Sequence, residues 1–299
     1  MKDSKEILAV GSIAFDSIET PNGNRNKILG GSCTYFSVAA SIYTKVSIIG
    51  IVGDDFTNKE WALFNTYNIN TKSVDIKNGK TFSWGGKYNN DYSSRDTLFT
   101  DLGVFENYNP KKLSSINKNG TLFLANIHPQ LQLNVLNQLN KNVSLVVADT
   151  MNLWIDADLL GLNDVISKSN IFLLNDEEAI QLTGCSDLLE AGKYIMNQGP
   201  STVIIKMGSK GSLLLDEEGS YHMPCVPNID VYDPTGAGDS FAGGFIGFIS
   251  QFGIENKKLA LAYASAIASY TVSDFGISNL LNLNLDSIKS RVKIIETLM

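Results

Sequence analysis

The sequence has 299 residues, 43% of them hydrophobic, and a formal net charge of −7 with a pI of about 4.9. This acidic balance argues against nucleic-acid and anionic-membrane partners, because both are attracted to basic protein surfaces. Three widely spaced cysteines exclude a disulfide framework, and the lack of a long apolar run or a signal-peptide core indicates a cytoplasmic protein in a reducing setting.

Short apolar runs and glycines alternate at the start of the chain. Ile7–Gly11 is an apolar run that ends in glycine, which predicts a buried strand leading into a loop. Asp16 follows closely, and ligands collect beyond the carboxyl ends of strands in open α/β sheets. The stretch 29–32, with a pair of glycines, then opens an apolar helix that runs through 36–41, and residues 46–56 predict a second buried strand followed by a turn.

The character of the chain changes between residues 81 and 108. Aromatic and polar residues alternate there with glycines, a pattern typical of twisted, half-exposed strands and not of a buried parallel sheet. Lys87 and Arg95 are the cations of this stretch. Each either reaches a substrate or remains a solvated side chain.

Strands and helices alternate regularly in the second half. This order predicts βαβ units, and therefore an α/β fold in three layers, with a mostly parallel sheet and helices on both faces. At 299 residues the chain is long enough for one such domain with a small accessory sheet. The predicted strands are 121–127, 144–149, 171–174 and 202–206, and the predicted helices are 130–139, 177–183 and 188–198.

Polar residues follow three of these strands. Asn175 and Glu178 fall on one side of a helix's first turn, where their oxygens either hold hydrated Mg²⁺ or form an N-cap with acidic first-turn residues. Lys206 opens a hairpin-like turn and offers a point cation to a phosphate. Asp149 either contacts a substrate or belongs to a turn.

The most informative stretch begins at Asp233. A Pro-Thr turn and two glycines, Gly236 and Gly238, open directly into an apolar helix. The free N–H groups and the positive dipole end of such a helix favour an anion such as phosphate. Asp239 stands at the same place, where a carboxylate is suited to take a proton from an attacking hydroxyl.

Three other motifs do not fit this loop. A dinucleotide fingerprint requires a small residue where Phe241 stands, and a Walker A loop requires glycine where Val74 stands. A nucleophile elbow at Ser240 requires a later histidine, but both histidines, His128 and His222, come earlier.

The stretch 233–244 instead resembles the second signature of the ribokinase-like (PfkB) family of sugar and nucleoside kinases. The resemblance extends over nearly the whole chain. It implies that Asp239 is the catalytic base and that the amides of Gly236, Ala237 and Gly238 form the anion hole.

The resemblance also implies a site for ATP and Mg²⁺. Asn175 and Glu178 match the family's Asn-x-x-Glu motif and would hold Mg²⁺ through water. Asp233 matches a position that ligates K⁺ in some members, although an aspartate before proline also initiates turns. The nucleotide-binding positions it implies are Asn175, Lys206, Gly208, Gly211, Thr235, Gly236, Gly238, Ala268 and Val272. Helical spacing makes core packing an alternative for the last two.

The acceptor site implied by the resemblance lies in the first half of the chain. Tyr35 departs from the family pattern, which usually has Asn there, so the ring either stacks on the acceptor or packs internally. This change also puts ribose itself in doubt as the substrate. The implied acceptor-binding positions are Asp16, Gly30, Gly31, Tyr35, Arg95 and Asp239.

The resemblance further implies a single domain over 1–299 with an inserted β-sheet lid. We place the lid strands at about 13–30 and 79–108, and the lid is a candidate homodimer surface. The predicted function is ATP-dependent phosphorylation of a primary hydroxyl group on a sugar. Alternatives are a nucleoside kinase of the same family, a catalytically silent nucleotide- or sugar-binding regulator, and a hydrolase that uses Ser240.

Overall fold

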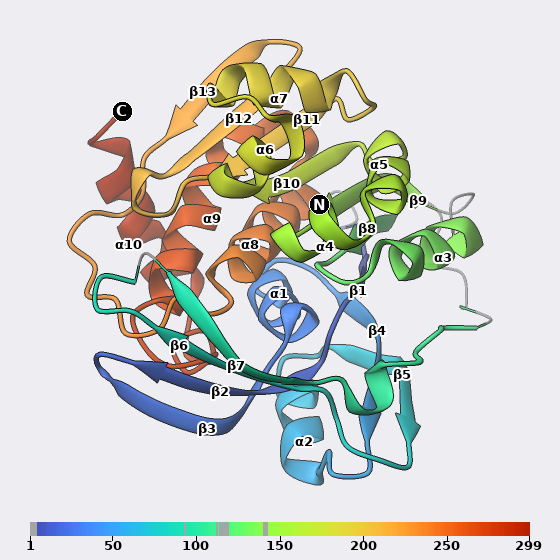
Figure 1. Cartoon of the computed structure of the whole chain (residues 1–299). Helices are drawn as coiled ribbons and strands as arrows, with labels where there is room; N and C mark the ends of the chain where they lie inside the picture. Colours follow the sequence, from blue (N-terminus) through green and yellow to red (C-terminus); the bar gives the residue numbers. More distant parts are fainter. Residues whose placement is uncertain (1–4, 93, 112, 114–119, 140–142) are drawn as a thin grey trace.

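A nine-stranded sheet forms the centre of the fold (Figure 1). The computed structural model describes residues 5–92, 94–111, 113, 120–139 and 143–299. The strands of this sheet are β1 (Ile7–Val10), β4 (Val46–Gly53), β5 (Asn70–Lys77), β8 (Gly120–Leu124), β9 (Val143–Asp149), β10 (Ile171–Asn175), β11 (Thr202–Lys206), β12 (Ser212–Asp216) and β13 (Gly219–Met223).

The strand order is β13-β12-β11-β10-β9-β8-β1-β4-β5. Neighbours are parallel from β11 to β5, whereas β11, β12 and β13 pair antiparallel. The predicted mostly parallel α/β sheet is therefore confirmed. The hairpin-like turn predicted after Lys206 connects β11 to β12.

Helices cover both faces of the sheet. In β1, Ile7 and Ala9 belong to one apolar cluster, and Leu8 and Val10 belong to another on the opposite face. Because both faces of the strand are buried, it needs a continuous apolar run instead of an alternating pattern. The helices are α1 (Ser32–Ser41), α2 (Asn58–Thr66), α3 (Pro129–Leu139), α4 (Asn152–Ala157), α5 (Leu159–Ser167), α6 (Asp176–Thr183), α7 (Leu188–Met196), α8 (Ala237–Phe252), α9 (Lys257–Thr271) and α10 (Leu285–Glu296).

Close packing of α1 against α8 depends on glycine. A Cβ atom at Gly243 would lie 2.4 Å from the carbonyl oxygen of Phe36, and one at Gly247 would lie 3.1 Å from Cα of Ala40. The two helix backbones approach each other at these glycines because no side chain intervenes. This contact fixes α8 in the core and so positions its first turn.

A second, four-stranded sheet lies at one end of the molecule (Figure 1). Its strands are β2 (Ala14–Thr20), β3 (Gly23–Gly30), β6 (Ser83–Tyr88) and β7 (Arg95–Asp101), in the order β3-β2-β6-β7. These strands fall within the two ranges predicted for the lid, and we call this sheet the lid. It has one parallel pair, β2 with β6, and two antiparallel pairs.

The inner face of the lid packs on the C-terminal part of the chain. Ile18 and Tyr88 form a small apolar cluster with Phe275. The Asn22 side chain, at the β2–β3 turn, donates to the carbonyl oxygen of Val231 at 2.8 Å. All residues of β7 are exposed, including Phe99, so dimerisation through the lid stays a prediction. Among the helices described, none is long and apolar enough to cross a membrane.

We expect Gly243→Ala to lower the free energy of unfolding by about 1–3 kcal/mol, because the added methyl group overpacks the α1–α8 contact. Urea titration monitored by circular dichroism measures this change. Lys289→Ala on the exposed side of α10 is the control and should change stability by less than about 0.5 kcal/mol. Equal stability of the two variants would show that α1 and α8 do not need this close approach.

Candidate active site

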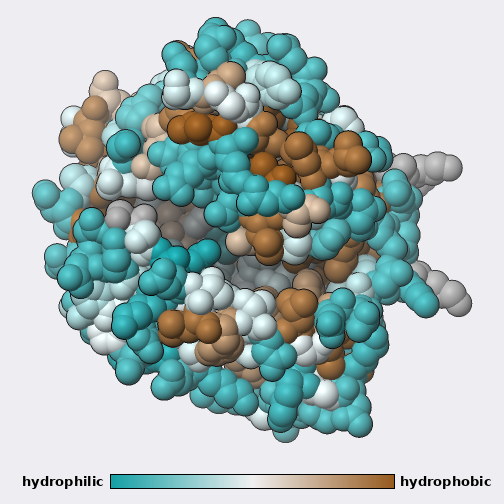
Figure 2. Space-filling view, in the orientation of Figure 1, coloured by the Kyte–Doolittle hydropathy of each residue, from teal (hydrophilic) through white to brown (hydrophobic). Residues whose placement is uncertain are grey.

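Polar side chains from several elements meet where the parallel strands end. Asp149, Asn175 and Lys206 are the last residues of β9, β10 and β11, which run in the same direction in the sheet. Asp16 comes from β2 in the lid, and the charge of Asp239, in the first turn of α8, raises the pKa of Asp16. Figure 2 shows that the surface is hollowed at the centre of this face.

The start of α8 presents free backbone donors. Gly236 has φ +74°, in the left-handed region, and a Cβ atom there would lie 2.3 Å from the ring of Tyr35. Only glycine suits both constraints. The N–H of Ala237 donates to the carbonyl oxygen of Pro234, but within the described ranges the N–H groups of Gly236, Gly238 and Asp239 have no acceptor. These donors, together with the helix dipole, suit an anion.

Asp239 lies beside these donors, and no group in the described part of the chain donates a hydrogen bond to its carboxylate. The pKa of Asp239 is raised to about 7: desolvation is the largest cause, the negative charge of Asp149 also raises it, and the ammonium of Lys206 lowers it. A carboxyl group with a pKa near 7 is suited to accept a proton at neutral pH.

Lys206 forms a buried ion pair with Asp149. Its Nζ atom donates to Oδ1 of Asp149 at 3.0 Å and to Oδ2 at 2.8 Å. Desolvation lowers the pKa of Lys206, but the carboxylates of Asp149, Glu178 and Asp239 outweigh it, so the net shift is upward. A Cβ atom at Gly238 would lie 3.3 Å from Nζ, which places the ammonium next to the free amides.

Asn175 and Glu178 form a capping box at the start of α6. Oδ1 of Asn175 accepts the N–H of Glu178 at 2.7 Å, and Oε2 of Glu178 accepts the N–H of Asn175 at 2.8 Å. Desolvation raises the pKa of Glu178 to about 7, although the Lys206 charge lowers it. The N-cap role and the Mg²⁺ role predicted for this motif are compatible, because Oε1 of Glu178 takes no part in the capping box and can still face a hydrated ion.

The described residues contain no group of three or more His, Cys, Asp or Glu side chains that could hold a metal ion. Mg²⁺ fits this site only as an ion that is carried largely by phosphates and water. The desolvated carboxyl groups of Glu178 and Asp239 have raised pKa values, which indicates that a further cation would be accommodated nearby.

A cavity of about 890 Å³ extends from Lys206 along the start of α8 to α9. Its lining includes six of the predicted nucleotide-binding residues, namely Lys206, Gly208, Gly211, Gly238, Ala268 and Val272. Asn175, Thr235 and Gly236 are not among the lining residues. The sequence did not indicate the segment 225–229 or Tyr92 of the lid, which also line the cavity, because neither carries a recognisable motif.

Asp16 and the adjacent glycines form the acceptor side of the site. Asp16 is 4% exposed and accepts a hydrogen bond from the N–H of Gly31. Its pKa is raised to about 7: desolvation is the largest cause, this hydrogen bond lowers the pKa, and the charges of Asp233 and Asp239 raise it. A Cβ atom at Gly30 would lie 1.9 Å from Oδ2 of Asp16, so glycine makes room for this carboxylate.

Tyr35 and Arg95 occupy different environments. Tyr35 is 1% exposed and its ring packs under Gly236, which favours the packing alternative; its hydroxyl has no hydrogen-bond partner in the described residues. The guanidinium of Arg95 stacks over Trp84 at 4.9 Å and hydrogen-bonds the hydroxyl of Tyr88. The hydroxyl of Tyr88 in turn lies 3.0 Å from that of Thr235, so the lid contacts the anion-binding loop directly.

Asp233 is fully buried and organises that loop. Its Oδ1 accepts the N–H of Thr235 at 2.9 Å, and its Oδ2 accepts the N–H of Gly276 at 3.0 Å. Desolvation raises the pKa of Asp233. The turn-initiating role is therefore present in the structure, and ligation of K⁺ stays a prediction.

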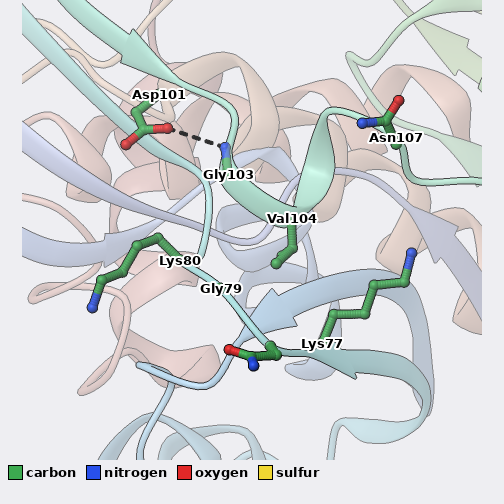
Figure 3. A pocket seen from close by; sticks show the side chains of 8 residues that line it. Lys77, Gly79, Lys80, Asp101, Gly103, Val104 and Asn107 are labelled. Carbon is green, nitrogen blue, oxygen red and sulfur yellow. Dashed lines mark hydrogen bonds between the residues drawn. The ribbon is translucent and has the colours of Figure 1, made fainter.

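A second cavity, of about 460 Å³, shares no residue with this site (Figure 3). It lies between the end of β5 and the 3-10 helix η1 (Gly103–Phe105), and its two cationic residues are Lys77 and Lys80. Figure 3 shows their side chains extending in different directions, so their charges do not converge on one point.

A family model described as pfkB family carbohydrate kinase matches residues 5–283. The chain is 28% identical over 253 residues to a cytidine kinase from Thermococcus kodakarensis, covering 82% of this chain and 89% of that protein.

Two solved structures have the same fold. One is aminoimidazole riboside kinase from Salmonella enterica with aminoimidazole riboside and an ATP analogue (TM-score 0.78, 20% identity, 96% of this chain and 99% of that one). The other is a double mutant of fructokinase from Vibrio cholerae O395 with fructose, ADP and potassium (TM-score 0.82, 17% identity, 98% of this chain and 100% of that one).

We expect Gly236→Ala to weaken MgATP binding by at least about tenfold, because the left-handed conformation costs a non-glycine residue about 1–2 kcal/mol and the methyl group meets Tyr35. Titration calorimetry measures the affinity. Gly184→Ala is a matched control, since Gly184 has φ +71° with no atom within 4 Å of the added Cβ. If both variants bind MgATP like the wild type, the loop does not hold the nucleotide.

Proposed function

Because the chain belongs to the pfkB family of carbohydrate kinases, we propose that it transfers the γ-phosphoryl group of ATP to a primary hydroxyl group of a small acceptor. The observation that carries this proposal is the first turn of α8. Three N–H groups without acceptors in the described residues lie there, beside a carboxyl group whose pKa is raised to about 7.

Asp239 is the general base of the proposed reaction. Its carboxylate takes the proton of the acceptor hydroxyl while that oxygen forms a bond to the γ-phosphorus. The bond between the γ-phosphorus and the β–γ bridging oxygen breaks, and ADP leaves. General base catalysis typically contributes about 10²–10⁴-fold in rate, so positioning and electrostatics must supply the rest.

The amides of Gly236 and Gly238, with the Lys206 ammonium, stabilise the charge on the phosphoryl oxygens. The 890 Å³ cavity beyond them is of a size for ATP, and Ala268 and Val272 on its wall would contact the adenine. The hydroxyl of Thr235 contacts that of the lid residue Tyr88, so Thr235 connects the nucleotide-binding loop to the lid.

When bound, Mg²⁺ would reduce the negative charge of the phosphates. Glu178, with Asn175 beside it, would hold that ion through water, since the capping box already uses one oxygen of each side chain. K⁺ near Asp233 remains part of the proposal, because both oxygens of that carboxylate keep a free lone pair.

The acceptor that we propose is a nucleoside, which the likeness to cytidine kinase over 89% of that protein supports. Asp16, with Gly30 and Gly31, would bind the sugar hydroxyls, and Arg95 would reach the acceptor from the lid. A free sugar is the second candidate, favoured by the shared fold with fructokinase.

Two other functions are disfavoured. Ser240 is not placed to act as the nucleophile of a hydrolase. It is fully buried, and its hydroxyl donates to the carbonyl oxygen of Ala237. A silent regulator would not need Asp239 with a pKa near 7 beside free amides.

We expect Asp239→Asn to lower kcat by at least about 10²-fold while the Kd for MgATP changes less than about threefold, because only the proton acceptor is lost. Coupled kinase assays and titration calorimetry measure the two quantities. Asp233→Asn serves as a comparison for the loss of a neighbouring buried carboxylate, since its amide can accept only one of the two N–H groups that Asp233 accepts. Unchanged kcat in Asp239→Asn would refute the base assignment.

The pH dependence of kcat/KM should show an acid limb with its midpoint near pH 7. Below this pH the Asp239 carboxyl group is protonated and cannot accept the hydroxyl proton; above it the group is ionised and activity reaches a plateau. Initial rates between pH 5 and 9 at constant ionic strength measure the profile. A limb with its midpoint near pH 4 would mean that Asp239 is not desolvated in the working enzyme.

A panel of nucleosides and free sugars should identify the acceptor. We expect at least one pyrimidine or purine nucleoside to be phosphorylated with a kcat/KM about tenfold or more above that of any free pentose or hexose, because base contacts add binding energy. ATP consumption and mass spectrometry of the products measure this preference. Stronger turnover of fructose or another free sugar would replace the nucleoside proposal by the second candidate.

A further inference from the structure

The ion pair between Asp149 and Lys206 is not needed to form the anion-binding loop or to supply the base. Asp149 is 2% exposed and its two oxygens accept from the same ammonium at 3.0 and 2.8 Å. Its Oδ1 also accepts the N–H of Thr150 at 2.9 Å. A carboxylate so completely engaged has little capacity left for a substrate, so the alternative of direct substrate contact is not favoured.

A buried ion pair is also a poor way to stabilise a fold. Removing both charges from water costs about as much as their attraction returns, and well-packed apolar side chains often serve as well or better. The placement of this pair therefore calls for another reason. It lies where β9 and β11 end, 57 residues apart in sequence, at the edge of the sheet where the candidate active site is found.

The geometry of Lys206 supplies that reason. Lysine has three N–H donors on a flexible stem, and Asp149 accepts two of them. Nζ lies close to Gly238, and Lys206 lines the 890 Å³ cavity. The third donor is thus available to a ligand in that cavity, on the same side as the amides of the first turn of α8.

We propose that Asp149 is a positioning residue of the transfer reaction, which holds the Lys206 ammonium against the phosphoryl oxygens and away from the carboxylate of Asp239. This inference rests on the proposed function. Without Asp149, the carboxylates whose charges still act on Lys206 are those of Glu178 and Asp239. An ammonium paired with Asp239 would compete for the base and leave the phosphoryl group less well neutralised.

The charge of Asp149 has a second effect, on the proton affinity of the base. It raises the pKa of Asp239, and the Lys206 ammonium lowers it. The other titratable groups whose charges couple to Asp239 are Asp16 from β2, and Tyr35 and Cys33 from α1. Burial raises the pKa of this tyrosine and this cysteine, so both are neutral near pH 7. Removing the Asp149 charge should therefore lower the pKa of Asp239.

The structure offers a matched control for breaking a buried ion pair. Asp216 and Lys257 pair at 2.6 Å, with side-chain exposures of 3% and 20%, against 3% and 16% for Asp149 and Lys206. Asp216 pairs with Thr202 at the far end of β11 from Lys206. Asp216→Asn thus reports the structural effect of losing a buried carboxylate without touching the site.

The test is a double-mutant cycle of wild type, Asp149→Asn, Lys206→Gln and the double variant, with Asp216→Asn as control. Steady-state kinetics with ATP and the best acceptor of the panel give kcat, KM for ATP and the pH profile, and thermal unfolding reports stability. We expect Asp149→Asn to raise KM for ATP about tenfold and to lower kcat about tenfold or more. The acid limb of its kcat/KM profile should move by about one unit to lower pH.

Asp216→Asn should keep kcat and KM for ATP within about twofold of wild type and leave the pH profile unchanged, whatever its melting temperature. In the Lys206→Gln background, Asp149→Asn should change KM for ATP by less than about threefold, because Asp149 acts on ATP through Lys206. Asp149→Asn alone leaves the Lys206 ammonium buried without its partner and could fail to fold. The double variant leaves no unpaired buried charge, so its comparison with Lys206→Gln still measures the effect of Asp149.

Two results would overturn the inference. One is an Asp149→Asn variant with the kinetics and pH profile of Asp216→Asn; the other is an additive cycle, in which Asp149→Asn has its full effect on KM for ATP without Lys206. A wild-type protein that transfers no phosphoryl group to any acceptor would instead refute the proposed function, and this inference with it.

Discussion

The first turn of α8 has to satisfy two opposed requirements. It must be held rigidly in the core, yet its peptide N–H groups must remain without acceptors so that they can bind an anion. Glycine resolves this conflict twice. Gly243 lets α8 lie directly against α1, and Gly236 lets the chain enter the helix in the left-handed conformation over the ring of Tyr35. The amides are free because the first N–H groups of a helix have no intrahelical acceptor, and the glycine contacts hold them in place.

Electrostatics at this turn follow from the same packing. Asp16, Glu178 and Asp239 all have pKa values raised to about 7, in each case chiefly because burial disfavours the charged form. Lys206 is the cation that acts on both Glu178 and Asp239. A site so arranged disfavours full ionisation of its carboxyl groups and gains from any further cation, which is what a metal-bound nucleotide brings.

Much of this arrangement could be predicted from the sequence because it is local. Continuous apolar runs predict strands buried on both faces, and β1, β4 and β10 follow that pattern. The stretch 233–244 carries its own turn, glycines and carboxylate, so its resemblance to the PfkB signature correctly indicated the family that the match over residues 5–283 shows. The spacing of Asn175 and Glu178 alone likewise predicted that Asn175 caps the N-terminus of a helix.

The parts that could not be predicted depend on contacts between distant residues. Nothing near Asp149 indicates that it pairs with Lys206, since the two meet only when β9 and β11 lie in one sheet. Tyr35 could stack on a ligand or pack inside, and only the position of Gly236 above it favours packing. The contact of Tyr88 with Thr235 likewise requires the lid to be placed over the loop.

The most direct test of this account is the titration of the Asp239 carboxyl group by ¹³C NMR on protein labelled at its aspartate side chains, with Asp239→Asn used to assign the resonance. The account predicts a midpoint near pH 7, because the carboxylate is desolvated next to Asp149. A midpoint near the ordinary value of about 4 would contradict it, since the carboxylate would then be solvated and no more basic than one on the surface.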